Sequence, residues 1–284
     1  MTRLSGHQSV LTLDNDRTDE AVRGVAGTHE PVGTVDAGAP SLSERLRCWW
    51  TLGSGAFAIT LTTSLYLLSG GHRRDAAKFS RWVRRMADVL MMLTGLRIQV
   101  HHRADVTDLG PVIFVANHQS VLDIPFAAKA VPVPFGFVAK SELARVPFLG
   151  HAIRYSPSVF LDRSNPRESI ASIRNAGASI RKGSSVIIYP EGSRSYSQEL
   201  GPFKKGAFLL AIEAGVPLVP LVIHDSCKCL NERDGWGRRG TVHVTVGEPI
   251  ELEGVGRGDL NALMHRVRST MLAELKAGFD NATA

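Results

Sequence analysis

Two short strings in the sequence carry side chains suited to acid–base chemistry and anion binding. The first, NHQSVLD, contains His118 and, five positions later, Asp123. The second, YPEGSRS, contains Glu191 and Arg194. An imidazole with a carboxylate partner is a common general base, and a guanidinium matches the oxygens of a phosphate. Together the two strings predict one site that moves an acyl group onto a hydroxyl.

The spacing of the first string requires a turn between its two ionisable residues. On one helix, residues five apart are rotated by about 140° after a full turn, so His118 and Asp123 could not meet. Pro125 favours a helix that begins near Asp123, because proline fits a first helical turn. The carboxylate then reaches one imidazole nitrogen and leaves the other free to take a proton. Asp123 could instead be only a helix cap paired with Ser120.

No GxSxG string supplies an enzyme nucleophile, so direct attack by a substrate hydroxyl is the simpler mechanism. The second string follows an apolar run and could hold phosphate through Arg194, or form a surface turn with an internal Glu191–Arg194 pair. Further cationic candidates are each also consistent with a solvated surface charge. They are Lys140, Arg163, Lys204 and Lys205.

The composition fits one large domain with an N-terminal extension. The 284 residues carry a net charge of +6, and residues 1–47 hold five basic against seven acidic side chains, which leaves +8 for the remainder. A basic body suits anionic partners, but no nucleic-acid-binding motif is present. The three cysteines cannot all pair, which favours a reducing compartment. His224, Cys227 and Cys229 lack the second ligand pair of a zinc signature, so we expect no metal.

The N-terminal part predicts a tail followed by a membrane-associated segment over 41–95. Residues 1–40 lack an apolar period and are expected to be disordered, without a secretory signal peptide. Residues 48–71 contain no charge and are long enough to cross a bilayer, although a re-entrant, interfacial or buried helix stays open. If they cross, the arginine-rich stretch that follows places the downstream domain on the cytoplasmic side of the cell membrane.

An amphipathic helix is predicted directly after the uncharged segment. Phe79, Trp82, Val83, Met86 and Leu90 recur at steps of three and four residues, with basic residues on the other side. Such a helix could pack on the domain or lie on anionic lipid. Its position after the apolar segment favours lipid.

From residue 96 onward, strands alternate with helices, which predicts an α/β domain with a mostly parallel central sheet flanked by helices. The run PVIFVA is apolar throughout, as in a strand buried on both faces. Expected strands cover 96–101, 111–116, 185–189, 218–224 and 241–246. Expected helices cover 165–182, 206–214 and 259–277, and one begins near 123.

The two strings resemble the HxxxxD and FPEGTRS motifs of the lysophosphatidic acid (1-acylglycerol-3-phosphate) acyltransferase family. Three further stretches match in the family's order, and the resemblance covers residues 111–247. They are AKSELARVPFLG at 139–150, VFLDR at 159–163 and VPLVPLVI at 216–223.

This resemblance implies His118 as general base and Asp123 as its orienting partner. It implies a thioester donor, acyl-CoA or acyl carrier protein, a lysophospholipid acceptor at a membrane, and no cofactor. The acceptor phosphate is expected to contact residues of the second string and two further cations. These residues are Glu191, Gly192, Ser193, Arg194, Arg163 and Lys140.

The sequence departs from the family pattern at three positions. Tyr189 and Ser193 replace phenylalanine and threonine, and keep size and polarity. Pro157 stands where the family often has glycine, which changes the loop before Arg163.

The acceptor could be another lysolipid, such as lyso-ornithine lipid, and a non-catalytic lipid-binding protein is the alternative from another class. Acyl length, donor type and oligomeric state are left open.

Overall fold

The computed structural model describes residues 39–70, 75–146, 149–154, 156–161 and 166–278. The tail expected over 1–40 lies outside the described residues except for its last two positions. Arg163 lies outside them as well. Pro40–Ala284 forms one compact unit.

A seven-stranded sheet forms the centre of this unit, in the order β1-β9-β6-β2-β5-β3-β4. All neighbouring strands are parallel except β6 and β9, which are antiparallel. The predicted α/β fold with a mostly parallel sheet is therefore confirmed. The strands are β1 (Arg97–His102), β2 (Ile113–Ala116), β3 (Phe135–Lys140), β4 (Val159–Leu161), β5 (Ser185–Ile188), β6 (Leu218–His224) and β9 (Thr241–Val246). A separate hairpin pairs β7 (Leu230–Asn231) with β8 (Trp236–Gly237).

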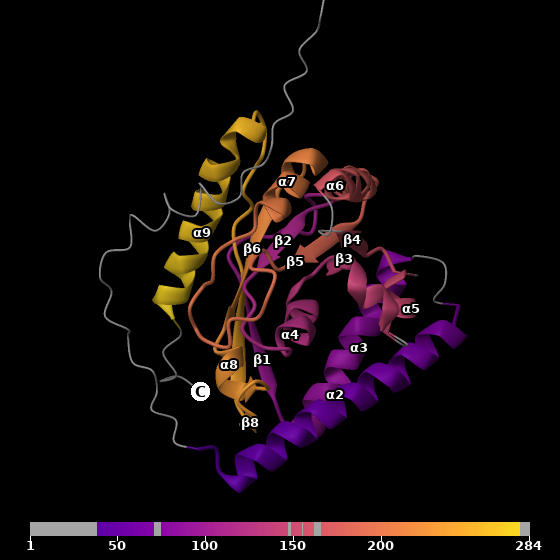
Figure 1. The fold of residues 1–284 in the computed structure, drawn as a ribbon, viewed down its shortest axis with the longest axis vertical. Coiled ribbons are helices and arrows are strands. Elements are labelled where there is room, and N and C mark those ends of the chain that lie inside the picture. The colour runs from indigo at the N-terminus through magenta and orange to yellow at the C-terminus, as the bar shows by residue number, and fades with distance from the viewer. Residues whose placement is uncertain (1–38, 71–74, 147–148, 155, 162–165, 279–284) are drawn as a thin grey trace, which may run out of the picture. The chain divides into compact units, whose positions relative to one another are not determined.

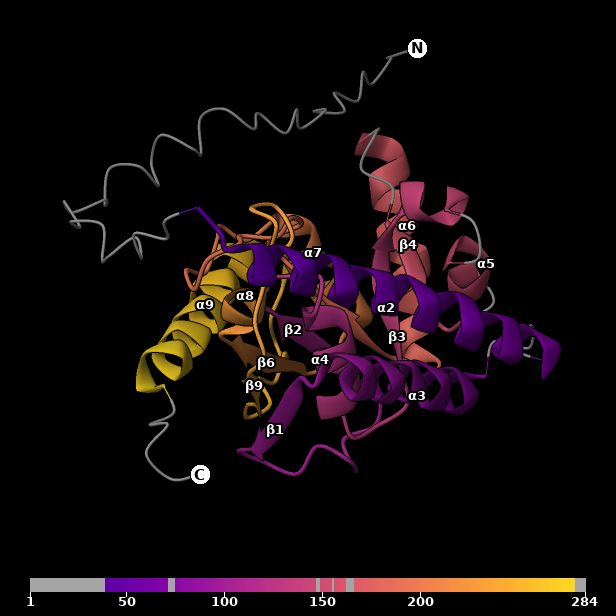
Figure 2. The same cartoon turned by 90° about the horizontal axis from the view of Figure 1, so that it is seen from below.

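Helices cover both faces of the sheet (Figures 1 and 2). The first face carries α2 (Leu42–Leu68), α3 (Ala76–Thr94) and α4 (Asp123–Ala130), and the second carries α6 (Pro166–Arg181), α7 (Lys205–Ala214) and α9 (Leu260–Ala277). Side chains alternate between the two cores: Phe114 joins the first and Ile113 the second. The short helices are η2 (Ser141–Arg145), α5 (Leu149–Arg154), α8 (Ser226–Cys229) and η3 (Arg257–Asp259).

The order of the strands brings the two sequence strings together. β2 lies between β5 and β6, and all three are parallel to one another. The loop after β2 and the turn after β5 therefore leave the same edge of the sheet. Helix α4 begins at Asp123, as predicted.

Helix α3 packs its apolar face into the domain, so the prediction that this face lies on lipid was wrong. Phe79 and Val83 are each 2% exposed, and Phe79 contacts Phe135 of β3 edge to face. Arg84 is also turned inward and donates to the carbonyls of Ala128, Val131 and Val133 at the end of α4. The same three- and four-residue period serves protein packing as well as lipid binding.

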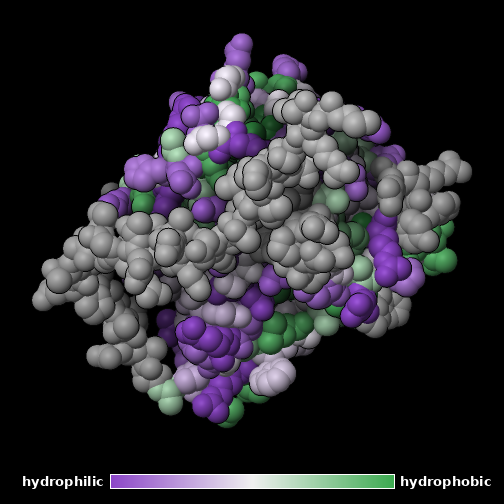
Figure 3. Space-filling model, turned by 45° about the horizontal axis from the view of Figure 1, so that its top comes forward, coloured by the Kyte–Doolittle hydropathy of each residue, from purple (hydrophilic) through white to green (hydrophobic). Residues whose placement is uncertain are grey.

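Helix α2 has small and polar residues on its inner face and large apolar residues on its outer face. The inner face includes Thr51, Ser54 and Ala58, all buried against the domain. Among the residues that the structure describes, eight of the twelve large exposed hydrophobic side chains lie on α2. The face of the molecule in Figure 3 mixes hydrophilic and hydrophobic side chains wherever residues are coloured. By length and composition α2 could cross a membrane. The eight are Leu42, Leu46, Trp49, Trp50, Phe57, Leu61, Leu65 and Leu68.

Strand β3 was not predicted, and its glycine explains why the local pattern is weak. A Cβ on Gly136 would lie 2.7 Å from the backbone carbon of Pro157 and the backbone nitrogen of Ser158. The loop that precedes β4 comes so close to β3 that only glycine fits at position 136. Glycine, however, weakens a strand. Pro157, the departure from the family pattern, lies at this contact.

Candidate active site

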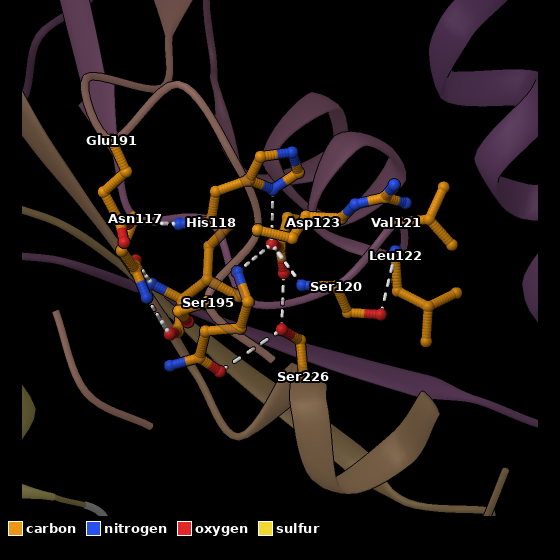
Figure 4. Close-up of polar contacts among 12 residues, drawn as sticks. Asn117, His118, Ser120, Val121, Leu122, Asp123, Glu191, Ser195 and Ser226 are labelled. Carbon is orange, nitrogen blue, oxygen red and sulfur yellow. Dashed lines mark hydrogen bonds and ion pairs between the residues drawn. The ribbon is translucent and has the colours of Figure 1, made fainter. Parts of the chain in front are cut away.

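His118 and Asp123 meet at the sheet edge, with His118 Nδ1 2.8 Å from Asp123 Oδ2 (Figure 4). The loop after β2 carries the histidine, and the first residue of α4 carries the aspartate. The Asp123 side chain is fully buried, whereas the His118 side chain is 16% exposed. Because a carboxylate only accepts hydrogen bonds, Nδ1 carries the proton and Nε2 is the nitrogen that can take one.

Donors surround both oxygens of the Asp123 carboxylate. Oδ2 also accepts from the backbone N–H groups of Gln119 at 2.5 Å and Ser120 at 2.8 Å. Oδ1 accepts from the hydroxyl of Ser226, at the start of α8. These donors offset the cost of burying the charge and fix the turn that holds His118.

Glu191 joins the His118 loop to the turn after β5, because both oxygens of its carboxylate accept backbone hydrogen bonds. Its Oε1 accepts from the His118 backbone N–H at 2.7 Å, and its Oε2 accepts from the Gly201 N–H at 2.9 Å. The residue is 5% exposed, and burial raises the pKa of its carboxyl while the two backbone donors oppose that rise. A second bond, from the Ser195 N–H to the His118 carbonyl at 2.8 Å, joins the same two segments.

The turn after β5 also supports the imidazole ring. Tyr189 stacks on His118 with ring centroids 4.3 Å apart. Gly192 has φ +74, and its N–H donates to the Tyr189 carbonyl at 3.1 Å. Glycine adopts this left-handed conformation without the strain that a side chain would add. Gly192 therefore shapes the turn through its backbone.

Arg194 is held by Glu232, a residue that the sequence did not point to. Arg194 Nη1 lies 2.6 Å from Glu232 Oε1, and the Arg194 side chain is 36% exposed. The same Glu232 oxygen accepts from the Val121 N–H at 3.3 Å. Glu232 thus joins Arg194 to the turn that contains His118 and Asp123. It follows β7, more than 100 residues after that turn, so no local sequence signal marks it.

The remaining residues expected to bind the acceptor phosphate are Ser193, Lys140 and Arg163. Ser193 and Lys140 are exposed, and Lys140 ends β3 at the same sheet edge as the two strings. Arg163 is outside the described residues. Among the residues that the structure describes, no three His, Cys, Asp or Glu side chains come together as metal ligands.

A narrow apolar cavity of about 240 Å³ opens beside the His118–Asp123 turn. Its walls come from the inner face of α2, from α3, and from the residues on both sides of Asp123. None of the described residues that line it is charged. The lining includes Thr51, Gly55, Ala58, Met86, Leu90, Val121, Leu122, Ile124 and Pro125. The cavity could hold a hydrocarbon chain.

Comparison with known proteins gives one family. A family model described as Acyltransferase matches residues 97–224. A 1-acyl-sn-glycerol-3-phosphate acyltransferase of Saccharomyces cerevisiae is 34% identical over 191 residues, which are 66% of this chain and 63% of that protein. A chloroplastic protein of the same name from Brassica napus is 31% identical over 246 residues, which are 83% of this chain and 70% of that protein.

A solved structure has the same fold. It is the crystal structure of the 1-acyl-sn-glycerophosphate acyltransferase from Thermotoga maritima, with a TM-score of 0.69 and 24% identity. The match covers 84% of this chain and 98% of that one.

Proposed function

The chain belongs to the 1-acyl-sn-glycerol-3-phosphate acyltransferase family, and from this we propose that it acylates the free hydroxyl of 1-acylglycerol-3-phosphate to give phosphatidic acid. The donor is a fatty acyl thioester of CoA or acyl carrier protein. The observation that carries the proposal is the His118–Asp123 pair, which leaves one imidazole nitrogen available for a proton. The turn that holds this pair is joined through Glu232 to Arg194 and borders an apolar cavity through Val121 and Leu122.

In the proposed reaction, His118 Nε2 takes the proton of the acceptor hydroxyl as its oxygen attacks the thioester carbonyl carbon. Asp123 holds the ring and stabilises the imidazolium that forms. When the tetrahedral intermediate collapses, the carbon–sulfur bond breaks and the proton returns from Nε2 to the thiolate. The products are the new ester and a free thiol, and the side chains return to their starting state.

His118→Ala should lower the rate of acyl transfer by about a hundredfold to ten-thousandfold, because the general base is lost. Transfer of radiolabelled acyl groups from acyl-CoA, with the circular dichroism spectrum as a check of folding, measures this. His265→Ala removes an exposed histidine of α9 and should keep the wild-type rate. Turnover near wild type in His118→Ala would remove the base from the mechanism.

The acceptor phosphate is proposed to bind at Arg194, with Lys140 and Arg163 as further cations. An arginine has five N–H donors, so the bond to Glu232 leaves others for a phosphate. Glu191 has a different role in this proposal: its carboxylate, held by two backbone N–H groups, positions the His118 loop. Gly192 and Ser193 form the turn that carries Arg194.

Arg194→Gln should raise the KM for 1-acylglycerol-3-phosphate about tenfold or more, since a charge-assisted bond to phosphate is lost. Monoacylglycerol, which has no phosphate, should be affected far less. Lyso-ornithine lipid completes the acceptor panel, and Arg257→Gln, an exposed arginine paired with Glu213, is the matched control. An equal loss for all acceptors, or wild-type preference for lyso-ornithine lipid, would contradict this acceptor assignment.

The donor's acyl chain is proposed to lie in the apolar cavity beside α4. Gly55 faces this cavity, and beyond the nearby backbone of α2 itself, the one described atom within 4 Å of an added Cβ is Leu90 Cδ1, at 3.9 Å. Gly55→Leu should therefore fill the cavity and shift the preferred donor toward shorter chains, whereas Gly55→Ala should change it little. Competition between acyl-CoA donors of different lengths measures this. An unchanged chain-length profile in Gly55→Leu would place the chain elsewhere.

Helix α2 is proposed to lie in the membrane surface on the cytoplasmic side without crossing the bilayer. It packs on the domain near both ends: the Trp50 indole donates to the Leu93 carbonyl, and Tyr66 stacks on Trp82. The helix is therefore attached to the domain along its length, and its outer face presents apolar side chains to lipid.

If α2 lies in one leaflet, both of its ends are on the same side of the membrane. Ser43→Cys and Ser69→Cys should then both react with an impermeant maleimide from the cytoplasmic side of inverted vesicles. The three native cysteines are buried and give the background in the wild-type protein. Labelling of the two positions from opposite sides would show that the helix crosses.

A further inference from the structure

Ser226 lies beneath the His118–Asp123 pair, and the proposed mechanism has not used it. Its side chain is fully buried, and its hydroxyl donates to Asp123 Oδ1 (Figure 4). Gln119 Oε1 lies 3.3 Å from the same hydroxyl oxygen. The Asp123 oxygen that Ser226 contacts is not the oxygen that contacts His118. Ser226 therefore fixes the carboxylate from the side opposite the imidazole.

The chain conformation before Ser226 is unusual and is held in place. Asp225 has φ +60, a left-handed conformation that is uncommon outside glycine. The Lys228 N–H donates to the Asp225 carbonyl at 2.9 Å, and the Lys228 ammonium pairs with the Asp225 carboxylate at 3.2 Å. Such strain persists only where the surroundings determine it. Here the turn delivers a hydroxyl from the end of β6 to the buried carboxylate.

The same segment contacts the catalytic turn at other points. The Ser120 hydroxyl donates to the Leu230 carbonyl at 2.9 Å, and Glu232 accepts from the Val121 N–H. These contacts fix the position of the segment against the turn, so Ser226 is not free to move away from Asp123. Ser226 and Glu232 both follow the last residue matched by the acyltransferase family model, residue 224.

We infer that Ser226 is a positioning residue: its hydroxyl holds the Asp123 carboxylate in the orientation in which Oδ2 meets His118 Nδ1. The inference rests on the proposed function, in which His118 is the base. Without the hydroxyl, one oxygen of a buried carboxylate lacks the partner seen here, and the carboxylate can rotate or recruit another donor. The His118 ring would then be held less well during proton transfer, while the residues proposed to bind either substrate are untouched.

The test compares Ser226→Ala and Ser226→Cys with the wild-type protein in kcat and in the KM of donor and acceptor. Cysteine keeps nearly the size of serine but is a weak donor, so a folded variant separates the hydrogen bond from packing. The kcat should fall about tenfold to a hundredfold in Ser226→Ala and by a smaller factor in Ser226→Cys, with both KM values nearly unchanged. Ser179→Ala, an exposed serine of α6, should leave all three constants unchanged.

A double-mutant cycle with Asp123→Asn decides whether Ser226 acts through the carboxylate. The effect of Ser226→Ala on kcat should nearly vanish in the Asp123→Asn protein, because the two changes remove one unit. A wild-type kcat in both Ser226 variants, or a loss that remains in full beside Asp123→Asn, would overturn the inference.

Nitrogen NMR of the His118 ring gives a readout that does not depend on turnover. The Nδ1–H signal, assigned by its absence in His118→Gln, should shift or broaden in Ser226→Ala and stay unchanged in Ser179→Ala. If the wild-type protein transfers no acyl group to any acceptor in the panel, the proposed function fails. The NMR comparison still tests the placement of Asp123 by Ser226, and an unchanged signal in Ser226→Ala would refute it.

Discussion

The site depends on a carboxylate that is removed from water and fully supplied with donors. Burying the charge of Asp123 is costly unless its oxygens are hydrogen-bonded. The chain meets this requirement with two backbone N–H groups, the imidazole of His118 and the hydroxyl of Ser226. Because the backbone donors come from the residues between His118 and Asp123, satisfying the carboxylate also shapes the turn. The same hydrogen bonds therefore stabilise the buried charge of Asp123 and place the imidazole of His118.

Two segments far along the chain complete this arrangement. The turn after β5 is joined to the His118 loop through Glu191 and through the bond from Ser195 to the His118 carbonyl. The segment after β6 is joined to it through Ser226 and Glu232. Both segments leave β-strands that flank β2, so the order of the sheet brings them to the loop without long connections. The turn between His118 and Asp123 also adjoins the apolar cavity through Val121 and Leu122, and Glu232 joins it to Arg194.

The sequence predicts those parts of the site that depend on local geometry. The start of α4 at Asp123 follows from Pro125 and from the five-residue separation, and strand β6 follows from its apolar run. The roles of Glu191, Ser226 and Glu232 do not follow, because the contacts that join them to the His118–Asp123 turn span 73 to 112 residues and no periodic pattern records them. The apolar face of α3 was wrongly predicted to lie on lipid, because apolar residues recur with the same period in a helix packed on a core and in one lying on a lipid surface. Strand β3 was not predicted because it contains Gly136, which weakens a strand pattern. Glycine is needed there because the backbone of Pro157 lies too close for a side chain.

The proposal places the acceptor hydroxyl at the imidazole nitrogen that Asp123 does not contact. The most direct measurement is the distance from that hydroxyl oxygen to His118 Nε2 in a structure of the protein with 1-acylglycerol-3-phosphate bound. A distance of about 2.6 to 3.2 Å, with the phosphate on Arg194, is the predicted result. A hydroxyl outside hydrogen-bonding reach of Nε2, or a ring that has left Asp123 to present Nδ1 to the acceptor, would contradict it.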